Sequence, residues 1–319
     1  MKRLQAVFVA VQALSAATPA VAAWPEQAIT MICPFPAGGA MDTVARQLAE
    51  NLKPHLPKPV AVTNRPGAAG TIGTAETVRA RPDGYTVGIT GSGVLTVQPH
   101  RTALPYKGPE DYALVIKTVT LPILIAVRTE SPHKTMRDLL AAAKAKPGEI
   151  RIGSPGIGTI LHLDLEALKL SAGVDITHVP FAGSAESVPT MLGGHIEAVA
   201  AHPSEVLAHV QAGKARVLMV FEPQRNPLYP EAPTAKELGH DITDSVYYLL
   251  IAPKGTPAEV IKTLNAAVIK AMAEPGFAAF AKNNGFSIDP KSPDALRAEL
   301  TASFQKNGEL VRKLGLVPK

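Results

Sequence analysis

The residues best suited to chemistry in this 319-residue chain are two glycines placed just ahead of a helix. An apolar run over residues 28–33 leads into the turn PFPAGG at 34–39, and apolar residues then recur at helical spacing from Met41 to Leu52. The first N–H groups of a helix lack partners within it, and the helix dipole favours negative charge there. Gly38 and Gly39 let a ligand approach this backbone closely. The segment predicts a site for a small anion such as a carboxylate; a plain strand-to-helix connection is the alternative.

A second segment repeats the pattern of strand, glycine turn and helix at residues 153–168, GSPGIGTILHLDLEAL. Its glycine spacing is not the dinucleotide-binding fingerprint, and no lysine follows as a phosphate-binding loop requires. Ser154 and Thr159 add hydroxyl groups next to the exposed amides. Two such helix starts, far apart in sequence, predict two lobes that face one cleft. The alternative is that two ordinary turns share the pattern by chance.

Motifs for catalysis and for metal binding are absent from the sequence. There is no HExxH motif and no Gly-x-Ser-x-Gly elbow, and the single cysteine, Cys33, allows neither a CxxC motif nor an internal disulfide. The nine histidines are dispersed, and no carboxylate pairs with a nucleophile. We therefore expect no metal, no cofactor and no enzymatic activity. A catalytic site assembled only in three dimensions is the alternative.

The N-terminus has the organisation of a secretory signal peptide. Residues 1–3 are basic at positions 2 and 3, residues 4–13 are mostly apolar, and residues 20–23 offer small side chains for cleavage. The apolar stretch is too short to span a bilayer, and no later run approaches the ~20 residues required. The sequence predicts a signal peptide over 1–23 and an exported, periplasmic chain. A helix packed against the core is the alternative.

Composition limits the class of partner. The formal net charge is +5, but lysine and arginine are scattered and aromatic residues make up only 5% of the chain. Nucleic-acid binding would require a basic block with interleaved aromatic residues, so no nucleic-acid partner is expected. The chain is too long for one ordinary core and suits two lobes.

Strand-like runs alternate with helical patterns from residue 28 to about 286, which predicts an α/β fold with largely parallel sheets. The predicted strands are 28–33, 59–64, 85–90, 121–127, 149–153, 174–179, 196–201, 215–220 and 246–252.

Helix ends are also predicted from local signals. We expect Thr135 with Asp138, Ser204, the capping box 256–259 and Ser292–Pro293 to begin helices. Pro189 is expected either to shift a helix start to 187–188 or to kink the helix.

Several segments in the same order resemble the tripartite tricarboxylate transporter substrate-binding proteins, the TctC or Bug family of periplasmic solute receptors. The matching segments, which include VTNRPGAAGTIG and RPDGYTV, are 24–25, 34–46, 62–73, 81–87, 143–163, 178–198, 212–220, 225–239 and 250–265. Each segment alone is weakly specific, whereas the ordered set covers nearly the whole chain after residue 23.

The resemblance implies a type II periplasmic-binding-protein fold. Two doubly wound α/β lobes would be joined by two crossover strands, near 121–127 and 246–252, with the ligand cleft between them. Lobe 1 would hold 24–124 plus 247–319, and lobe 2 would hold 125–246. The function implied is capture of a small organic carboxylate by a monomer that delivers it to integral membrane transporter subunits. A periplasmic sensor for a two-component system and an enzyme acting on a small acid or ester are the alternatives.

The resemblance also implies the ligand-binding residues, position by position. They are Phe35, Ala37, Gly38, Gly39, Asp42, Ser92, Ser154, Gly158, Thr159, His162, Phe181, Gly183, Ser184 and His202. Asp42 is interpreted as a residue that orients backbone N–H groups, because a second carboxylate would repel the ligand. Alternatives exist for three others: His162 orients its loop, Phe181 packs against the wall, and His202 lies on the surface. An apolar Phe181, where the family commonly has tyrosine, would suit an aromatic or longer carboxylate.

Overall fold

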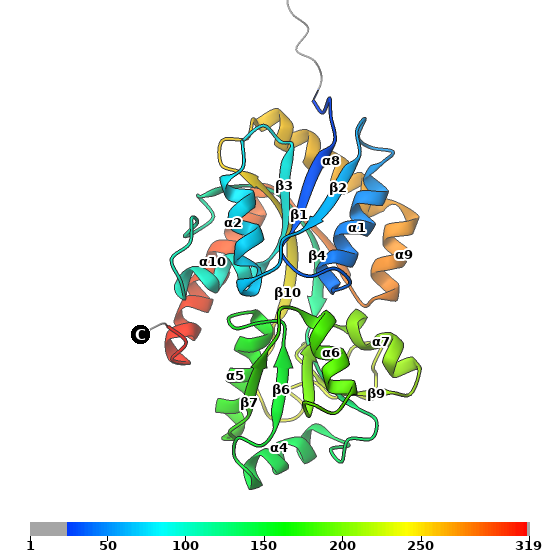
Figure 1. Ribbon diagram of the computed structural model, residues 1–319, viewed down its shortest axis with the longest axis vertical. Coiled ribbons are helices and arrows are strands. Elements are labelled where there is room, and N and C mark those ends of the chain that lie inside the picture. Colours follow the sequence, from blue (N-terminus) through cyan, green and yellow to red (C-terminus); the bar gives the residue numbers. More distant parts are fainter. Residues whose placement is uncertain (1–23, 318–319) are drawn as a thin grey trace, which may run out of the picture.

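The computed structural model describes residues 24–317, which form two α/β lobes stacked along the long axis of the molecule (Figure 1). The predicted signal peptide, residues 1–23, lies outside the described residues. Within residues 24–317 no helix is both long enough and apolar enough to cross a bilayer.

Lobe 1 is built on a six-stranded sheet with the order β11-β4-β10-β3-β1-β2. Its strands are β1 (Ile29–Cys33), β2 (Val60–Asn64), β3 (Thr86–Gly91), β4 (Tyr112–Pro122), β10 (Ser245–Pro253) and β11 (Ser287–Lys291). Strand β1 runs parallel to β2 and β3. Strand β10 runs antiparallel to β3 and β4, and β11 is antiparallel to β4.

Lobe 2 has a five-stranded sheet with the order β7-β6-β8-β5-β9. Its strands are β5 (Leu124–Arg128), β6 (Arg151–Ser154), β7 (Thr177–Pro180), β8 (Ala198–Ala201) and β9 (Ala215–Val220). Strand β6 is parallel to β7 and β8, whereas β5 is antiparallel to β8 and β9. The expectation of largely parallel sheets is therefore wrong: both sheets are mixed, because the strands that carry the chain between the lobes run against their neighbours.

The chain passes from lobe 1 to lobe 2 at Ile123, between β4 and β5, and returns through β10. The predicted strand 121–127 is thus the end of one strand and most of the next. Leu121, Ile123 and Ile125 are fully buried, so the junction belongs to the hydrophobic core that continues from one lobe into the other. The predicted lobe boundaries remain a prediction, and the sheet to which each strand belongs is consistent with them.

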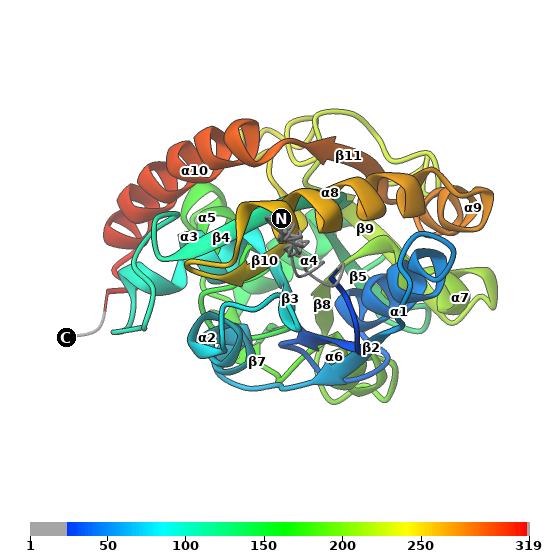
Figure 2. The same cartoon turned by 90° about the horizontal axis from the view of Figure 1, so that it is seen from above.

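Helices cover both sheets. They are α1 (Ala40–Leu52), α2 (Thr71–Arg79), α3 (Ser92–Thr96), α4 (Met136–Ala145), α5 (Ile160–Ala172), α6 (Ser184–Leu192), α7 (Pro203–Gln211), α8 (Ala258–Ala273), α9 (Pro275–Asn283) and α10 (Pro293–Lys313), with short 3₁₀ turns η1 (Ala68–Gly70) and η2 (Gln98–His100). The C-terminal helix α10 packs against α3 and β4 along one side of lobe 1 (Figures 1 and 2).

Two predicted helix caps are confirmed and two are wrong. Thr135 and Asp138 form the expected capping box of α4, and the Ser292 hydroxyl accepts from the Ala295 N–H at α10. The N-cap of α7 is His202 with Glu205 at the third position, so Ser204 lies inside the helix. The Thr256 hydroxyl instead donates to the Pro253 carbonyl, which leaves Pro257 as the residue before α8.

Helix α6 begins earlier than residues 187–188, which was the start given by one of the two alternatives for Pro189. The helix begins at Ser184, directly after Gly183, and Pro189 lies inside it. The first turn is therefore available to face the cleft.

Candidate ligand-binding site

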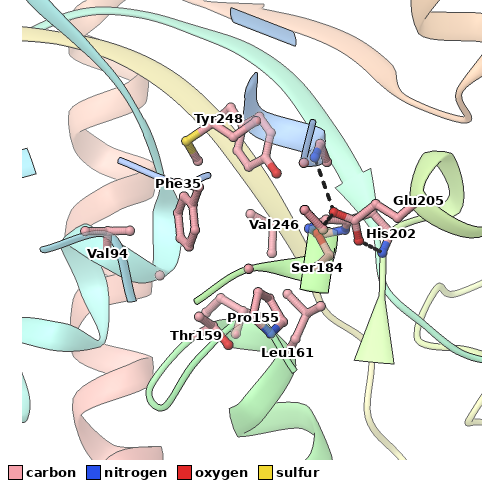
Figure 3. Close-up of a pocket in the computed structure, with 18 of the residues that line it drawn as sticks. Phe35, Val94, Pro155, Thr159, Leu161, Ser184, His202, Glu205, Val246 and Tyr248 are labelled. Carbon is pink, nitrogen blue, oxygen red and sulfur yellow. Dashed lines mark hydrogen bonds between the residues drawn. The ribbon is translucent and has the colours of Figure 1, made fainter. Parts of the chain in front are cut away.

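A cavity lies between the two lobes, and about 580 Å³ of space in and around it is free of protein atoms, open solvent included (Figure 3). Lobe 1 contributes Phe35, Pro36, Gly39, Ala40, Met41, Gly91, Gly93 and Val94; lobe 2 contributes Pro155, Thr159, Ile160, Leu161, Gly183, Ser184, Ala185, His202 and Glu205; and strand β10 contributes Val246 and Tyr248. Most of these side chains are apolar, and no lysine or arginine is among the described lining residues.

The two glycine-turn segments identified in the sequence open onto this same cavity. Gly39, just before α1, and Thr159, just before α5, both line it. The starts of α6 and α7 reach it as well, through Ser184 and His202. The N-terminal ends of four helices from both lobes therefore border one space and bring the positive ends of their dipoles to it, although the Ala40 N–H of α1 and the His202 N–H before α7 already donate to Glu205.

The lobes touch on both sides of the cavity. On one side the carbonyl of Ile157 in lobe 2 accepts from Gln98 Nε2 at 2.8 Å and from Arg101 Nη1 at 3.2 Å, both in lobe 1. On the other side the Ala40 N–H of lobe 1 donates to Glu205 Oε1 of lobe 2 at 3.3 Å. The structure therefore shows a closed arrangement of the lobes.

Asp42 does not line the cavity but holds the loop that does. Its carboxylate accepts from the Gly38 N–H at 3.0 Å, from Arg46 Nε at 2.9 Å and from Asn64 Nδ2 at 2.8 Å. Burial alone would raise the pKa of Asp42, but these hydrogen bonds outweigh it and hold that pKa below its ordinary value. This arrangement agrees with the interpretation of Asp42 as an orienting residue. The Gly38 N–H is occupied, so it is not available to a ligand.

Ser154, Gly158 and His162 lie behind the lining at the start of α5. The Gly158 N–H donates to His162 Nδ1 at 3.1 Å, so His162 orients the loop. Ser154 is fully buried, and its hydroxyl lies 2.6 Å from His178 Nε2. The rings of His162 and His178 stack with centroids 4.1 Å apart. Burial lowers the pKa of His162 to about 3 and that of His178 to about 4.

Three further predicted residues also lie outside the lining. Ala37 is exposed. The Ser92 hydroxyl accepts from the Tyr247 N–H at 3.3 Å and supports the β3–α3 turn from below. The Phe181 ring packs over Gly153, where an added Cβ would lie 3.0 Å from a ring carbon. Phe181 is therefore part of the packing of lobe 2, as the alternative interpretation expected.

Six of the predicted residues do line the cavity: Phe35, Gly39, Thr159, Gly183, Ser184 and His202. His202 is buried, not on the surface. Its Nδ1 lies 2.7 Å from the Pro122 carbonyl, which requires a proton on Nδ1, so in the neutral ring Nε2 is the acceptor. The ring meets Tyr248 edge to face, with centroids 6.3 Å apart.

Sequence reasoning missed two polar residues of the site, Glu205 and Tyr248. Glu205 stands three residues after His202, which is the spacing of a capping box, but histidine is an unusual first member of that motif. Tyr248 lies on β10 beside Tyr247, and only the alternation of the strand decides which of the two faces the cleft. The structure turns Tyr248 to the cavity and Tyr247 to the opposite face, where Lys117 lies over its ring.

The comparisons with known proteins agree with this geometry. A family model for the tripartite tricarboxylate transporter family receptor, TctC, matches residues 44–316. The chain belongs to this family. TctC relatives include Protein BugT of Bordetella pertussis, which is 32% identical over 324 residues that cover 99% of this chain and 98% of BugT.

Solved structures of TctC-like proteins have the same fold. The periplasmic binding protein BugD is similar, with a TM-score of 0.87, 29% identity and coverage of 93% of this chain and 100% of BugD. Rpa4515 of R. palustris, solved with adipate, has a TM-score of 0.88 and 26% identity over 93% of this chain and 100% of its own. The expected two-lobe periplasmic-binding-protein fold is thereby confirmed.

Proposed function

We propose that this TctC-family protein is an extracytoplasmic receptor that captures a small organic carboxylate between its lobes. The observation that carries the proposal is the convergence of four helix N-termini, from both lobes, on one cavity that no lysine or arginine of the described residues lines. Peptide N–H groups and helix dipoles can bind an anion without a basic side chain. The receptor would deliver its ligand to the integral membrane subunits of a tripartite tricarboxylate-type transporter.

The start of α5 and the hydroxyl of Tyr248 both line the cavity and offer hydrogen-bond donors to a ligand from different walls. Ile160 and Leu161 are the first residues of α5 and line the cavity, and the first N–H groups of a helix have no intrahelical acceptor. Tyr248 is only 4% exposed, and no hydrogen bond joins its hydroxyl to another described residue (Figure 3). Burial raises the pKa of Tyr248, so the phenol keeps the proton it would donate.

The remaining walls suit an apolar ligand body. Phe35 and Val94 come from lobe 1, and Leu161 and Val246 line the cavity from lobe 2 and β10 (Figure 3). Met41 of lobe 1 is a further apolar lining residue. Burying apolar ligand surface against them contributes about 25 cal/mol per Å². Rpa4515, a similar protein, was solved with adipate, a dicarboxylate whose aliphatic chain supports a ligand with an apolar body.

Among the described residues, Ser154 and His178 come close to a nucleophile and its base, but their position favours a receptor over an enzyme. Ser154 and His178 are within hydrogen-bonding distance, but Ser154 is fully buried and lies outside the cavity lining. Its partner His178 packs against the ring of a second histidine, and no carboxylate within residues 24–317 is hydrogen-bonded to it. A nucleophile must reach its substrate, and this hydroxyl does not.

Calorimetric titration of refolded, ligand-free protein with a panel of carboxylates and the corresponding amides tests the proposal. We expect micromolar binding of at least one acid, about −8 kcal/mol, and much weaker binding of its amide. Tyr248→Phe should weaken that binding by about three- to tenfold through loss of one hydrogen bond. Tyr247→Phe, on the other face of the same strand, is the matched control and should leave it unchanged. Equal binding of acids and amides would refute an anion site.

A further inference from the structure

The carboxylate of Glu205 occupies the junction of three helix starts. Its Oε1 accepts from the Ala40 N–H, the first residue of α1, and from the hydroxyl of Ser184, the first residue of α6. Its Oε2 accepts from the N–H of His202, the N-cap of α7, at 2.8 Å. One protein carboxylate therefore joins lobe 1 to lobe 2 at the edge of the cavity that it lines (Figure 3).

This position is the anion site that the sequence predicts at the start of α1. The two acceptor directions of Glu205 Oε1 are both used, so the Ala40 N–H at the α1 start and the Ser184 hydroxyl already have an internal anion as their acceptor. A ligand carboxylate could take this place only by displacing Glu205, which would break three hydrogen bonds and remove the cap of α7.

We propose that Glu205 is a specificity-determining residue that fills one carboxylate position of the cleft with the protein's own carboxylate. The receptor would then select monocarboxylates with an apolar body over dicarboxylates. This inference rests on the proposed function and narrows its ligand class.

Charge and lining both favour the monoanion. A dicarboxylate that places one end at the α5 start must direct its other end along the apolar walls or toward Tyr248 and Glu205. Like charges brought together in a partly buried site disfavour binding, and no lysine or arginine of the described lining residues neutralises them. The apolar side chains Phe35, Met41 and Val246 instead suit a ligand end without charge.

Two matched pairs of ligands test the inference on the unmodified protein. The pairs are adipate with its monoamide, and 4-carboxyphenylacetate with phenylacetate, each titrated into refolded, ligand-free receptor. We expect the monoanion of the pair that binds to have at least about tenfold higher affinity than the dianion. A dianion that binds as tightly as its monoanion would overturn the inference while leaving the proposed function intact. Failure of every acid to bind would count against the proposed function itself.

Removing the charge of Glu205 should reduce the preference for a monoanion over the matching dianion. Glu205→Gln keeps the length of the side chain and removes its charge, so the affinity ratio between monoanion and dianion should fall to about threefold or less. Gln98→Ala is the matched control, since it removes a hydrogen bond between the lobes on the other side of the cavity and should leave the ratio unchanged. A ratio that Glu205→Gln leaves unchanged would also overturn the inference. The wild-type ratio decides the matter if the variant does not fold.

Discussion

Asp42 places a negative charge beside the start of α1, and its hydrogen bonds explain why this charge does not oppose ligand binding. All three of its donors, the Gly38 N–H, Arg46 and Asn64, hold it on the loop side of the α1 start. Arg46 also offsets its charge. The carboxylate thus fixes the backbone at Gly38, and the next two residues, Gly39 and Ala40, line the cavity. Asp42 is therefore a positioning residue.

Replacing Asp42 by asparagine should lower the free energy of unfolding by about 1–3 kcal/mol at neutral pH, because charge-assisted hydrogen bonds are lost. The folded pKa of Asp42 lies below its ordinary value of 3.8, so this stabilisation is present above that value and is lost as pH falls through the folded value. Urea unfolding of both proteins from pH 7 downward should show the gap closing below pH 3.8. Glu50→Gln, on the exposed side of the same helix, is the control. A gap that persists in acid would contradict the assignment.

The stacked pair His162 and His178 predicts loss of stability in mild acid. Their folded pKa values, about 3 and about 4, lie below the ordinary 6.5, so the unfolded chain binds more protons between these values. The free energy of unfolding should therefore fall as pH drops from 6.5 toward 4. His178→Gln removes one titrating group and should flatten this slope, whereas His195→Gln, at an exposed position, should not. The same slope in all three proteins would exclude the pair as its source.

At the scale of elements, the two N-caps that the sequence assigned to Thr135 and Ser204 give a direct comparison. Thr135→Ala should cost about 1 kcal/mol, because the hydroxyl accepts the Asp138 N–H in a complete capping box. Ser204→Ala should change stability by less than about 0.5 kcal/mol, since among the described residues its hydroxyl has no hydrogen-bond partner. Thermal or urea unfolding measures both. If Ser204→Ala destabilises the protein as much as Thr135→Ala does, the result would support the predicted N-cap at Ser204 over the assignment to His202.

The elements that sequence reasoning predicted are those specified locally. Glycine turns before 40 and 160, and apolar runs such as 28–33, carry their signal within a few residues. Residues 112–120 of strand β4 are not predicted as a strand, because Lys117 interrupts their apolar pattern. The structure buries that lysine between Asp289, at 2.7 Å, and Glu299, at 2.9 Å, which come from distant parts of the chain. Such compensation cannot be predicted from local sequence.

The candidate site shows the same division between local and long-range information. The turn residues that bear backbone N–H groups were predicted, because glycine before a helix has a physical meaning on its own. Glu205 was not, since a glutamate in a first helical turn ordinarily faces solvent. Its role depends on Ser184, which is distant in sequence within the same lobe, and on Ala40 of lobe 1, which reaches it only when the lobes close. Whether the side chains of Phe181 and His202 face the cavity likewise depends on packing against distant segments, Gly153 for Phe181 and Pro122 for His202.

At the scale of the whole molecule, protein groups alone hold the lobes together on both sides of the cavity. Gln98 and Arg101 bind the Ile157 carbonyl on one side, and Glu205 binds the Ala40 N–H on the other. A ligand stabilises the closed form only by its differential affinity for that form, so contacts that favour closure without ligand raise the apparent affinity.

Gln98→Ala should therefore weaken binding of every ligand by about two- to tenfold, which corresponds to the loss of one hydrogen bond between the lobes. The ligand-free variant should also spend more time open, so its radius of gyration by small-angle X-ray scattering should exceed that of the wild-type protein. Saturating ligand should bring the two values together, because ligand closes both. Glu76→Gln, which breaks an exposed ion pair within lobe 1, should change neither quantity. Unchanged affinity and unchanged scattering in Gln98→Ala would show that the Gln98 hydrogen bond does not govern closure.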